Sequence, residues 1–248
     1  MILKSQFADP DKSISQLIQG FWMIENESET DLEATVLPDG MVDLLLFKSS
    51  TESFQAVLTG INTGPSDVVV VSKTKIFAVT FKLLAIEYLL RNPIPNLLNS
   101  MKPASNEFWQ FGVNDLNDFE LFCRKTTEKV KSIMPDNIDV RKRELFELIY
   151  SSNGSLSVKE LSEKVYWSPR QINRYFNHQF GISLKAYCNI LRFRASLDHI
   201  KQGRLFPEGN FFDQAHFIKE VKKLSGVPPK ELKQNKNDRF LQFNAIQP

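Results

Sequence analysis

The sequence predicts an α+β protein in which an N-terminal antiparallel β-barrel or β-sandwich domain is followed by an all-α domain. The first hundred residues contain short β-branched and aromatic runs bounded by turn signals. From Asp115 onwards, apolar residues recur at three- and four-residue intervals, which is the helical pattern. The charge divides in the same way, because residues 1–136 carry a net charge of −6 and residues 137–248 a net charge of +8. This asymmetry indicates that only the second half meets a polyanion.

The composition is that of an ordinary globular protein. The 248 residues are enough for two domains, with 42% hydrophobic and 24% charged residues. No run of eighteen apolar residues occurs, and residues 1–4 do not resemble the start of a signal peptide. We therefore expect a cytoplasmic protein with no membrane partner. Cys123 and Cys188 are far apart and outside any metal-ligand spacing, so two buried free thiols are expected.

Residues 1–105 are predicted to form the β-rich sensing or dimerisation domain. The expected strands include residues 44–47, 68–71 and 76–81. Turn signals separate them, among them Pro38-Asp39-Gly40. Because no long helix lies between the strands, an antiparallel arrangement is favoured over a parallel α/β sheet. A short helix is expected over residues 83–91, where Pro93 stops it.

Residues 106–136 are predicted to be a helical connector. Phe119, Phe122 and Val130 are among the apolar residues that recur there at helical spacing. Two interpretations fit this apolar face equally. It covers the β-rich domain, or it packs two protomers together, which makes a homodimer one expected assembly.

Residues 137–248 are predicted to form a helix-turn-helix domain. A helix over residues 140–151 ends at Asn153-Gly154, and the Ser157-x-x-Glu160 capping box begins the next helix at once. Ser168-Pro169-Arg170-Gln171 begins another, with Ser as N-cap and Pro at the first helical position. So short a connection forces the two helices to cross steeply, as in a helix-turn-helix.

The helix over residues 169–180 has two distinct faces. Ile172, Phe176 and Phe180 follow each other at four-residue spacing and form a stripe that must face the core. The opposite face, near the N-terminal end, carries the candidate DNA contacts Arg170, Asn173 and Arg174. Arginine can bind guanine and asparagine can bind adenine in the major groove, which the N-terminal part of a recognition helix enters.

A second unit is predicted after a long helix from Ser183 to about Gln202. In the helix over residues 213–224, Phe217, Val221 and Leu224 form the buried stripe. His216, Lys219 and Lys223 share another face.

On these residues, the chain from about 138 to 235 resembles the AraC/XylS family of bacterial transcription regulators. The stretch from Phe212 to Pro229 follows the family's signature: aromatic, Asp, Gln, small, His, Phe, then a basic helix ending Gly-x-x-Pro. The resemblance implies two helix-turn-helix subdomains joined by a long helix, each with a recognition helix in the major groove. By matching position it also implies base contacts from Gln214, His216 and Lys219.

One segment departs from the family pattern. The family has a full helix between the long helix and the second recognition helix, whereas residues 203–210 contain two Gly and a Pro. These residues disfavour a helix, so the second unit is expected to be truncated.

The N-terminal part carries a second resemblance. Gly20-Phe21-Trp22, followed by residues 36–44, is similar to a small β-rich sensor domain found in front of some AraC-type regions. This resemblance implies a regulatory input and a small-molecule effector, with no ligand-binding residue assigned. The aromatic residues of this part are open to two interpretations, core or effector pocket: Trp22, Phe47, Phe54, Phe77 and Phe81.

We therefore expect a sequence-specific, effector-responsive transcription regulator, an activator, that reads double-stranded DNA with helices 169–180 and 213–224 and acts with RNA polymerase. The alternative is a helical adaptor that binds a protein partner, with the β domain as a dimerisation module. No enzyme, cofactor or metal is expected, because no phosphate loop, nucleophile motif or metal-spaced histidine pair occurs. Asp39 and Asp43 are interpreted as a turn residue and a strand-end residue.

Overall fold

The computed structural model describes residues 3–104, 109–205, 211 and 213–241. Within these residues the strands are β1 (Leu3–Ala8), β2 (Ile18–Asn26), β3 (Leu32–Val36), β4 (Val42–Lys48), β5 (Gln55–Thr59), β6 (Ser66–Val70), β7 (Thr74–Phe81) and β8 (Met101–Pro103). The helices of the C-terminal part are α1 (Phe119–Ile133), α2 (Val140–Ser151), α3 (Val158–Val165), α4 (Pro169–Phe180), α5 (Leu184–Lys201), α6 (Gln214–Ser225) and α7 (Pro229–Gln234). Shorter helical segments are η1 (Ile86–Leu90), η2 (Pro95–Leu97), η3 (Val113–Asn117) and η4 (Lys236–Asp238).

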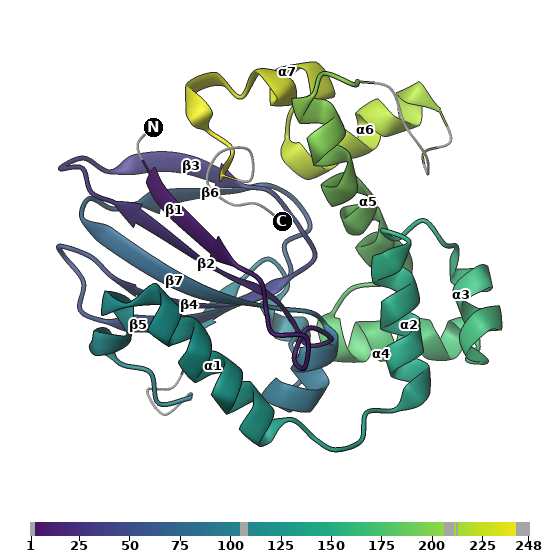
Figure 1. Ribbon diagram of the computed structural model, residues 1–248. Helices are drawn as coiled ribbons and strands as arrows, with labels where there is room; N and C mark the ends of the chain where they lie inside the picture. Colours follow the sequence, from purple (N-terminus) through teal and green to yellow (C-terminus); the bar gives the residue numbers. More distant parts are fainter. Residues whose placement is uncertain (1–2, 105–108, 206–210, 212, 242–248) are drawn as a thin grey trace.

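The strands form two antiparallel sheets that face each other. The six-stranded sheet has the order β1-β2-β7-β4-β5-β8, and β3 pairs with β6 (Figure 1). β1 and β8 are edge strands, so the large sheet stays open, and the predicted barrel-or-sandwich fold takes the sandwich form. Ile24, Ala34 and Val70 pack between the two sheets. The predicted α+β class, with antiparallel strands first and helices after, is confirmed.

The two faces of the large sheet have different roles because side chains alternate along each strand. On β4, Leu44 and Leu46 are fully buried on one face. Asp43 and Leu45 point to the other face, which is turned towards β3 and β6, and Asp43 pairs in register with Thr80 of β7. The second face therefore carries a carboxyl group inside the sandwich.

The connector helix α1 covers the first face of the large sheet (Figure 1). The ring of Phe122 lies 5.4 Å from that of Phe77 and 6.3 Å from that of Phe21. Phe119 also contacts Phe77, at 5.3 Å. Of the two interpretations of this helix, the structure shows the one in which it covers the β-rich part of the same chain. The predicted boundary between residues 105 and 106 lies outside the described residues.

Helices α3 and α4 begin at the predicted residues with the predicted caps, and α4 has the predicted bounds of 169–180. Ser157 Oγ accepts from the Glu160 amide at 3.2 Å, while the Ser157 amide donates to Glu160 Oε2 at 2.8 Å. Ser168 and Gln171 repeat this capping box at the start of α4. The predicted stripe Ile172, Phe176 and Phe180 is fully buried.

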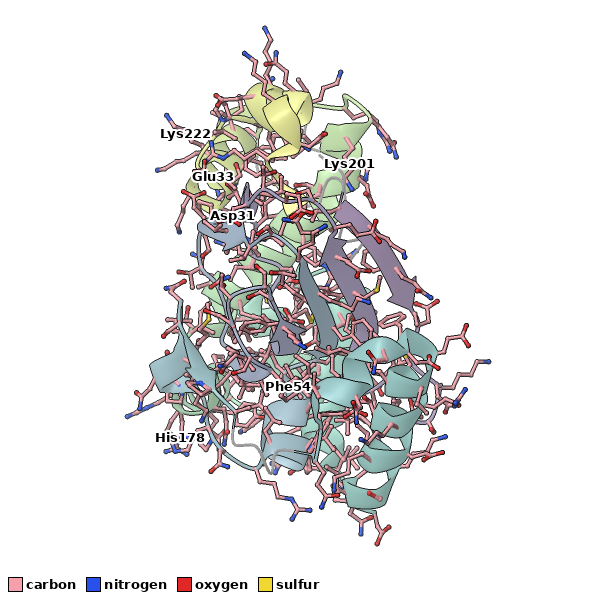
Figure 2. All side chains as sticks on the ribbon, turned by 90° about the vertical axis from the view of Figure 1, so that its left-hand side faces the viewer. Asp31, Glu33, Phe54, His178, Lys201 and Lys222 are labelled. Carbon is pink, nitrogen blue, oxygen red and sulfur yellow. The ribbon has the colours of Figure 1, made fainter. Side chains whose placement is uncertain are left out.

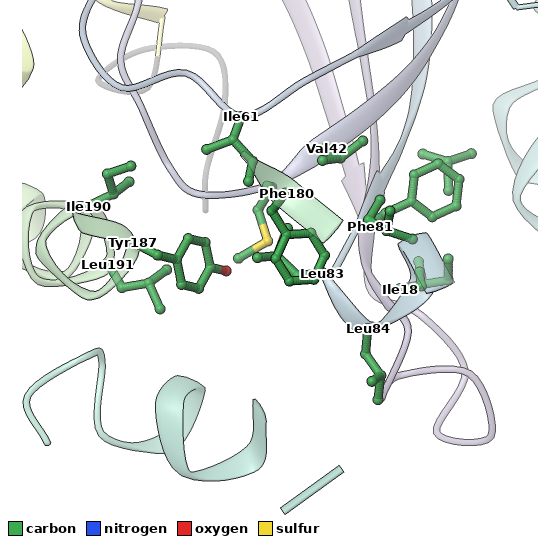
Figure 3. Close-up of a cluster of buried hydrophobic side chains, with 14 of the residues drawn as sticks. Ile18, Val42, Ile61, Phe81, Leu83, Leu84, Phe180, Tyr187, Ile190 and Leu191 are labelled. Atoms are coloured by element: carbon green, nitrogen blue, oxygen red, sulfur yellow. The ribbon is translucent and has the colours of Figure 1, made fainter. Parts of the chain in front are cut away.

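One continuous hydrophobic core joins the large sheet to α2, α4 and α5. Figure 3 shows Val42 and Phe81 of the strands gathered with Phe180, Tyr187 and Leu191 of the helices. Each of these side chains is at most 4% exposed. The β-rich part is therefore joined to α4 and α5 by a shared hydrophobic core.

Helix α5 runs from the first unit to the second (Figure 1). The backbone from Gln202 to Leu205 is not helical, and the rest of the segment predicted to lack a scaffold helix, residues 206–210, lies outside the described residues. α6 and α7 pack on α5 through a cluster of buried side chains: Phe217, Val221, Leu224 and Leu232. The chain then returns to the small sheet, where the Thr35 amide donates to the Arg239 carbonyl at 2.7 Å.

Three smaller expectations can be compared with the structure. The helix expected over residues 83–91 is present as a short helical turn continued by η1, which ends at Arg91 with a φ of 56°. Cys123 and Cys188 are free, Cys188 being buried and Cys123 partly buried. None of the described helices is long and apolar enough to cross a membrane.

Candidate nucleic-acid interface

The N-terminal half of α4 presents two arginines to solvent. Arg170 and Arg174 are exposed, and their four-residue spacing puts them on the same side of the helix. Neither guanidinium has a hydrogen bond or ion pair with another described residue. Both groups are therefore available for planar, bidentate contacts with base edges or phosphates.

The C-terminal half of α4 is attached to the β-rich part. The Ile94 amide donates to the Gln179 carbonyl at 2.8 Å. The Tyr175 hydroxyl donates to Glu87 Oε2 at 2.9 Å, and Lys142 Nζ lies 2.5 Å from the other oxygen of the same carboxylate. This attachment orients α4 and leaves its arginine-bearing end uncovered.

Asn173 lies between these two halves and is already bonded within the chain. Its Nδ2 donates to the Pro169 carbonyl at 3.0 Å, and its Oδ1 accepts from the Leu184 amide at 3.3 Å. The second bond joins α4 to the start of α5. The side chain predicted to pair with adenine thus holds the helix junction.

The three residues of α6 that were predicted to contact bases differ in exposure. Gln214 and Lys219 are exposed, as are Lys222 and Lys223. His216 is partly buried beside Phe211, with the two ring centroids 6.0 Å apart. Its Nδ1 is buried without a hydrogen-bond partner among the described residues. The exposed basic face of α6 therefore consists of its lysines, while His216 packs inwards.

Helix α5 links α4 to α6 along the chain. Its 18 residues span about 27 Å, to which a short turn is added at each end. Figure 2 places His178 of α4 and Lys222 of α6 near the lower and upper ends of the same edge of the molecule.

Tyr166 is an exposed residue in the turn between α3 and α4. It ends α3 in the left-handed conformation, with a φ of 51°, and its side chain is 92% exposed. Glycine or asparagine usually takes such a left-handed position at the end of a helix, so a tyrosine at this position is unusual. Trp167, the next residue, packs on Tyr175 at a ring distance of 5.3 Å, as expected of a residue between two helices.

A cavity of about 480 Å³ lies inside the sandwich, and α5 forms part of its wall. Of the five aromatic residues considered for an effector pocket, only Trp22 lines it. Phe77 and Phe81 are buried in the core on the other face of the sheet. Arg194 of α5 also lines this cavity.

Asp43 is the polar centre of the cavity wall. Trp22 Nε1 donates to Thr80 Oγ1 at 3.1 Å, and Thr80 Oγ1 donates to Asp43 Oδ1 at 2.5 Å. Burial, followed by the charge of the nearby Asp39, raises the pKa of Asp43 to about 7 from the ordinary value of 3.8. The interpretation of these two residues as a turn and a strand end is incomplete, because both also line the cavity.

Replacing Asp43 by Asn is expected to remove one pH dependence of stability. A folded-state pKa of about 7 means that the stabilisation associated with Asp43 is complete below about pH 4 and is lost as the pH rises through 7. The stability advantage of Asp43→Asn over the wild type should therefore grow between pH 5 and pH 8, by at most about 3 kcal/mol. Urea unfolding of both proteins at both pH values measures this gain, and an equal difference at the two pH values would contradict it.

No group of three or more His, Cys, Asp or Glu side chains among the described residues is placed to hold a metal ion.

Comparison with known proteins finds one family model. Residues 6–103 match a model described as "Domain of unknown function (DUF6597)". The curated proteins contain no match to the sequence. Among solved structures, ToxT from Vibrio cholerae O395 is 12% identical, with 95% of this chain and 98% of that chain covered and a TM-score of 0.42. The structure of unsaturated-fatty-acid-bound wild-type ToxT from Vibrio cholerae is 12% identical, covers 93% of each chain and has a TM-score of 0.37. By sequence, then, the β-rich segment is similar to a domain family of unknown function.

Proposed function

We propose that this protein is a sequence-specific DNA-binding transcription regulator that reads the major groove with α4. The observation that carries the proposal is the exposed N-terminal half of α4, where Arg170 and Arg174 stand on a helix-turn-helix held in place at its other end. Arginine bound to guanine O6 and N7 is the commonest specific contact in the major groove.

The proposal gives the predicted residues different roles. Arg170 and Arg174 read bases, Gln214 of α6 makes a second base contact, and Lys219 contacts phosphate. Asn173 and His216 support the helices, because the first is bonded to Pro169 and Leu184 and the second packs on Phe211.

The same surfaces favour DNA over a protein partner. Protein interfaces are depleted in lysine. The exposed positions of α6 include Lys219, Lys222 and Lys223, and residues 137–248 carry a net charge of +8. A polyanion is the partner that this chemistry fits best. A cytoplasmic location, action as an activator on RNA polymerase, and dimerisation on DNA belong to the same proposal.

Binding to DNA is expected to weaken steeply with added salt. Five exposed basic side chains on α4 and α6 would release several counterions, so affinity should fall by roughly two to three orders of magnitude between 50 and 200 mM salt. Lys219→Ala should lower the slope of the log–log salt plot by about one and weaken binding less than Arg174→Ala. Fluorescence anisotropy with a duplex selected from a random pool measures both quantities. A flat salt dependence would contradict the proposal, and an equal or larger loss in Lys219→Ala would contradict the ranking of the two helices.

A further inference from the structure

The cavity in the sandwich is bounded by charges of both signs from two parts of the chain. Asp39 lies in the turn before β4 and Asp43 lies on β4, and Asp9 after β1 adds a third carboxylate. Helix α5 contributes Arg194, together with Lys201 and Asp198, which pair with each other at 4.0 Å. No basic nitrogen of a described residue lies within 4.0 Å of the carboxylate of Asp39 or Asp43, and Arg194 has no ion pair within the same limit among those residues. Arg194 is nevertheless close enough to act on the charge of Asp43. The carboxylates of Asp39 and Asp43 and the guanidinium therefore share the cavity without neutralising each other in direct pairs.

The rest of the cavity wall is mainly apolar. Ile24, Leu45 and Ile76 belong to the large sheet, and Val68 belongs to β6 of the small sheet. The indole of Trp22 adds an aromatic surface beside Asp43 and is held in place by its hydrogen bond to Thr80. A volume of about 480 Å³ is within the range of small-molecule pockets, about 300–1,000 Å³. The cavity thus combines an apolar floor with the carboxylates of Asp39 and Asp43 from the β4 region and the guanidinium of Arg194 from α5.

We infer that this cavity binds a small amino carboxylate with an apolar body, such as an apolar α-amino acid. The ammonium group of the ligand lies at Asp39 and Asp43, its carboxylate lies at Arg194, and its apolar part lies on the floor beside Trp22. A ligand with only a carboxylate would leave the two acidic side chains unmatched, and one with only an amine would leave Arg194 unmatched. Asp39, Asp43 and Arg194 are partly buried, and an unmatched charge that is partly removed from water is costly, so the cavity favours the molecule that carries both groups.

The position of the ligand gives it a regulatory role, and this part rests on the proposed function. Helix α5 joins the two DNA-contacting units, and Arg194, Leu197 and Lys201 of α5 line the cavity. A ligand that binds both Asp43 and Arg194 connects α5 to the sandwich. Ligand binding therefore changes how firmly the two units are held relative to each other, and with it the affinity for DNA.

Three probes with the same aromatic body test the inference on the full-length wild-type protein. L-phenylalanine carries both charged groups, phenethylamine lacks the carboxylate, and 3-phenylpropionate lacks the ammonium group. Isothermal titration calorimetry at pH 8, where Asp43 is ionised, should show L-phenylalanine binding at least tenfold more tightly than either of the others. Equal or tighter binding of phenethylamine or 3-phenylpropionate, or no binding of any probe at millimolar concentration, would overturn the inference.

Single substitutions test which side chain binds each end of the ligand. Asp43→Asn should lower the affinity for L-phenylalanine at least tenfold and leave the affinity for 3-phenylpropionate unchanged. Arg194→Gln should also lower the affinity for L-phenylalanine at least tenfold, and should leave the affinity for phenethylamine unchanged. Glu33→Gln removes a charge from an exposed site on β3, outside the cavity, and should change none of the affinities (Figure 2). Losses that are the same for all three probes would overturn the assignment.

Binding of the probes is measured without DNA, so its failure leaves the proposed function untouched. In a second measurement, saturating L-phenylalanine should change the affinity of the protein for its selected duplex at least threefold. Tight binding of L-phenylalanine with an unchanged affinity for DNA would overturn the regulatory role. If the protein binds L-phenylalanine but no duplex, the proposed function fails and the ligand site stands.

Discussion

Replacing Arg170 and Arg174 together by alanine is expected to weaken binding to a selected duplex by roughly 30-fold to 10,000-fold. Each bidentate contact to a base contributes about 1–3 kcal/mol, and the two side chains occupy separate positions on α4. Both are exposed and away from the core, so the substitution should leave the fold intact. Anisotropy titrations with the selected duplex and with a scrambled duplex of equal length measure the loss of affinity and of specificity.

Arg124→Ala is the matched control for the arginine pair. It removes one positive charge, where the double variant removes two, from an exposed position on α1, far along the chain from α4. Its effect on DNA affinity should be less than threefold. If the double variant instead loses the same factor for the selected and the scrambled duplex, the two arginines contact only phosphates, and reading by α4 is contradicted.

Replacing Phe122 by alanine is expected to lower the free energy of unfolding by about 3–5 kcal/mol. The ring of Phe122 is fully buried under α1, where it contacts Phe77, Phe21 and Phe111. Its removal leaves a cavity between the helix and the sheet that the surrounding aromatic rings cannot easily fill. Urea unfolding followed by circular dichroism measures this loss.

Leu121→Ala tests whether the loss is specific to the buried face of α1. Leu121 is the adjacent residue on the same helix and is 45% exposed, so its truncation should cost less than about 1 kcal/mol. Equal losses in the two variants, or a loss in Phe122→Ala below about 1 kcal/mol, would contradict the packing of α1 on the sheet.

The first residues of α3 and α4 could be predicted because they depend on local chemistry. Ser157 with Glu160, and Ser168 with Gln171, form capping boxes within four consecutive residues. The buried stripe of α4 follows from helical spacing alone. No contact from elsewhere in the chain was needed to place these features.

The composition of the cavity could not be predicted because it depends on strand register. Asp43, Thr80 and Trp22 come together only when β4 and β2 pair with β7 on either side. In the sequence, Asp43 reads as an ordinary strand-end residue. The spacing of Arg194 gives its face on α5, but nothing in the sequence says that the sandwich covers that face.

The hydrogen bonds of Asn173 could not be predicted from the sequence pattern either. The helical spacing puts it on the polar side of α4, together with Arg170 and Arg174. Its bond to the Leu184 amide depends on the angle at which α5 leaves the turn after α4. Similarly, both interpretations of α1 satisfied the same apolar pattern, and only the position of the helix on the sheet separates them.

The central claim is that the exposed face of α4 reads DNA sequence. Selection of bound molecules from a pool of random duplexes, with the full-length protein and with the Arg170→Ala/Arg174→Ala variant, tests it most directly. We predict that the wild type enriches a short shared motif, with any second contacted segment about one helical turn away, and that the variant does not enrich this motif. A wild-type pool without enrichment, or the same motif enriched by both proteins, would contradict the claim.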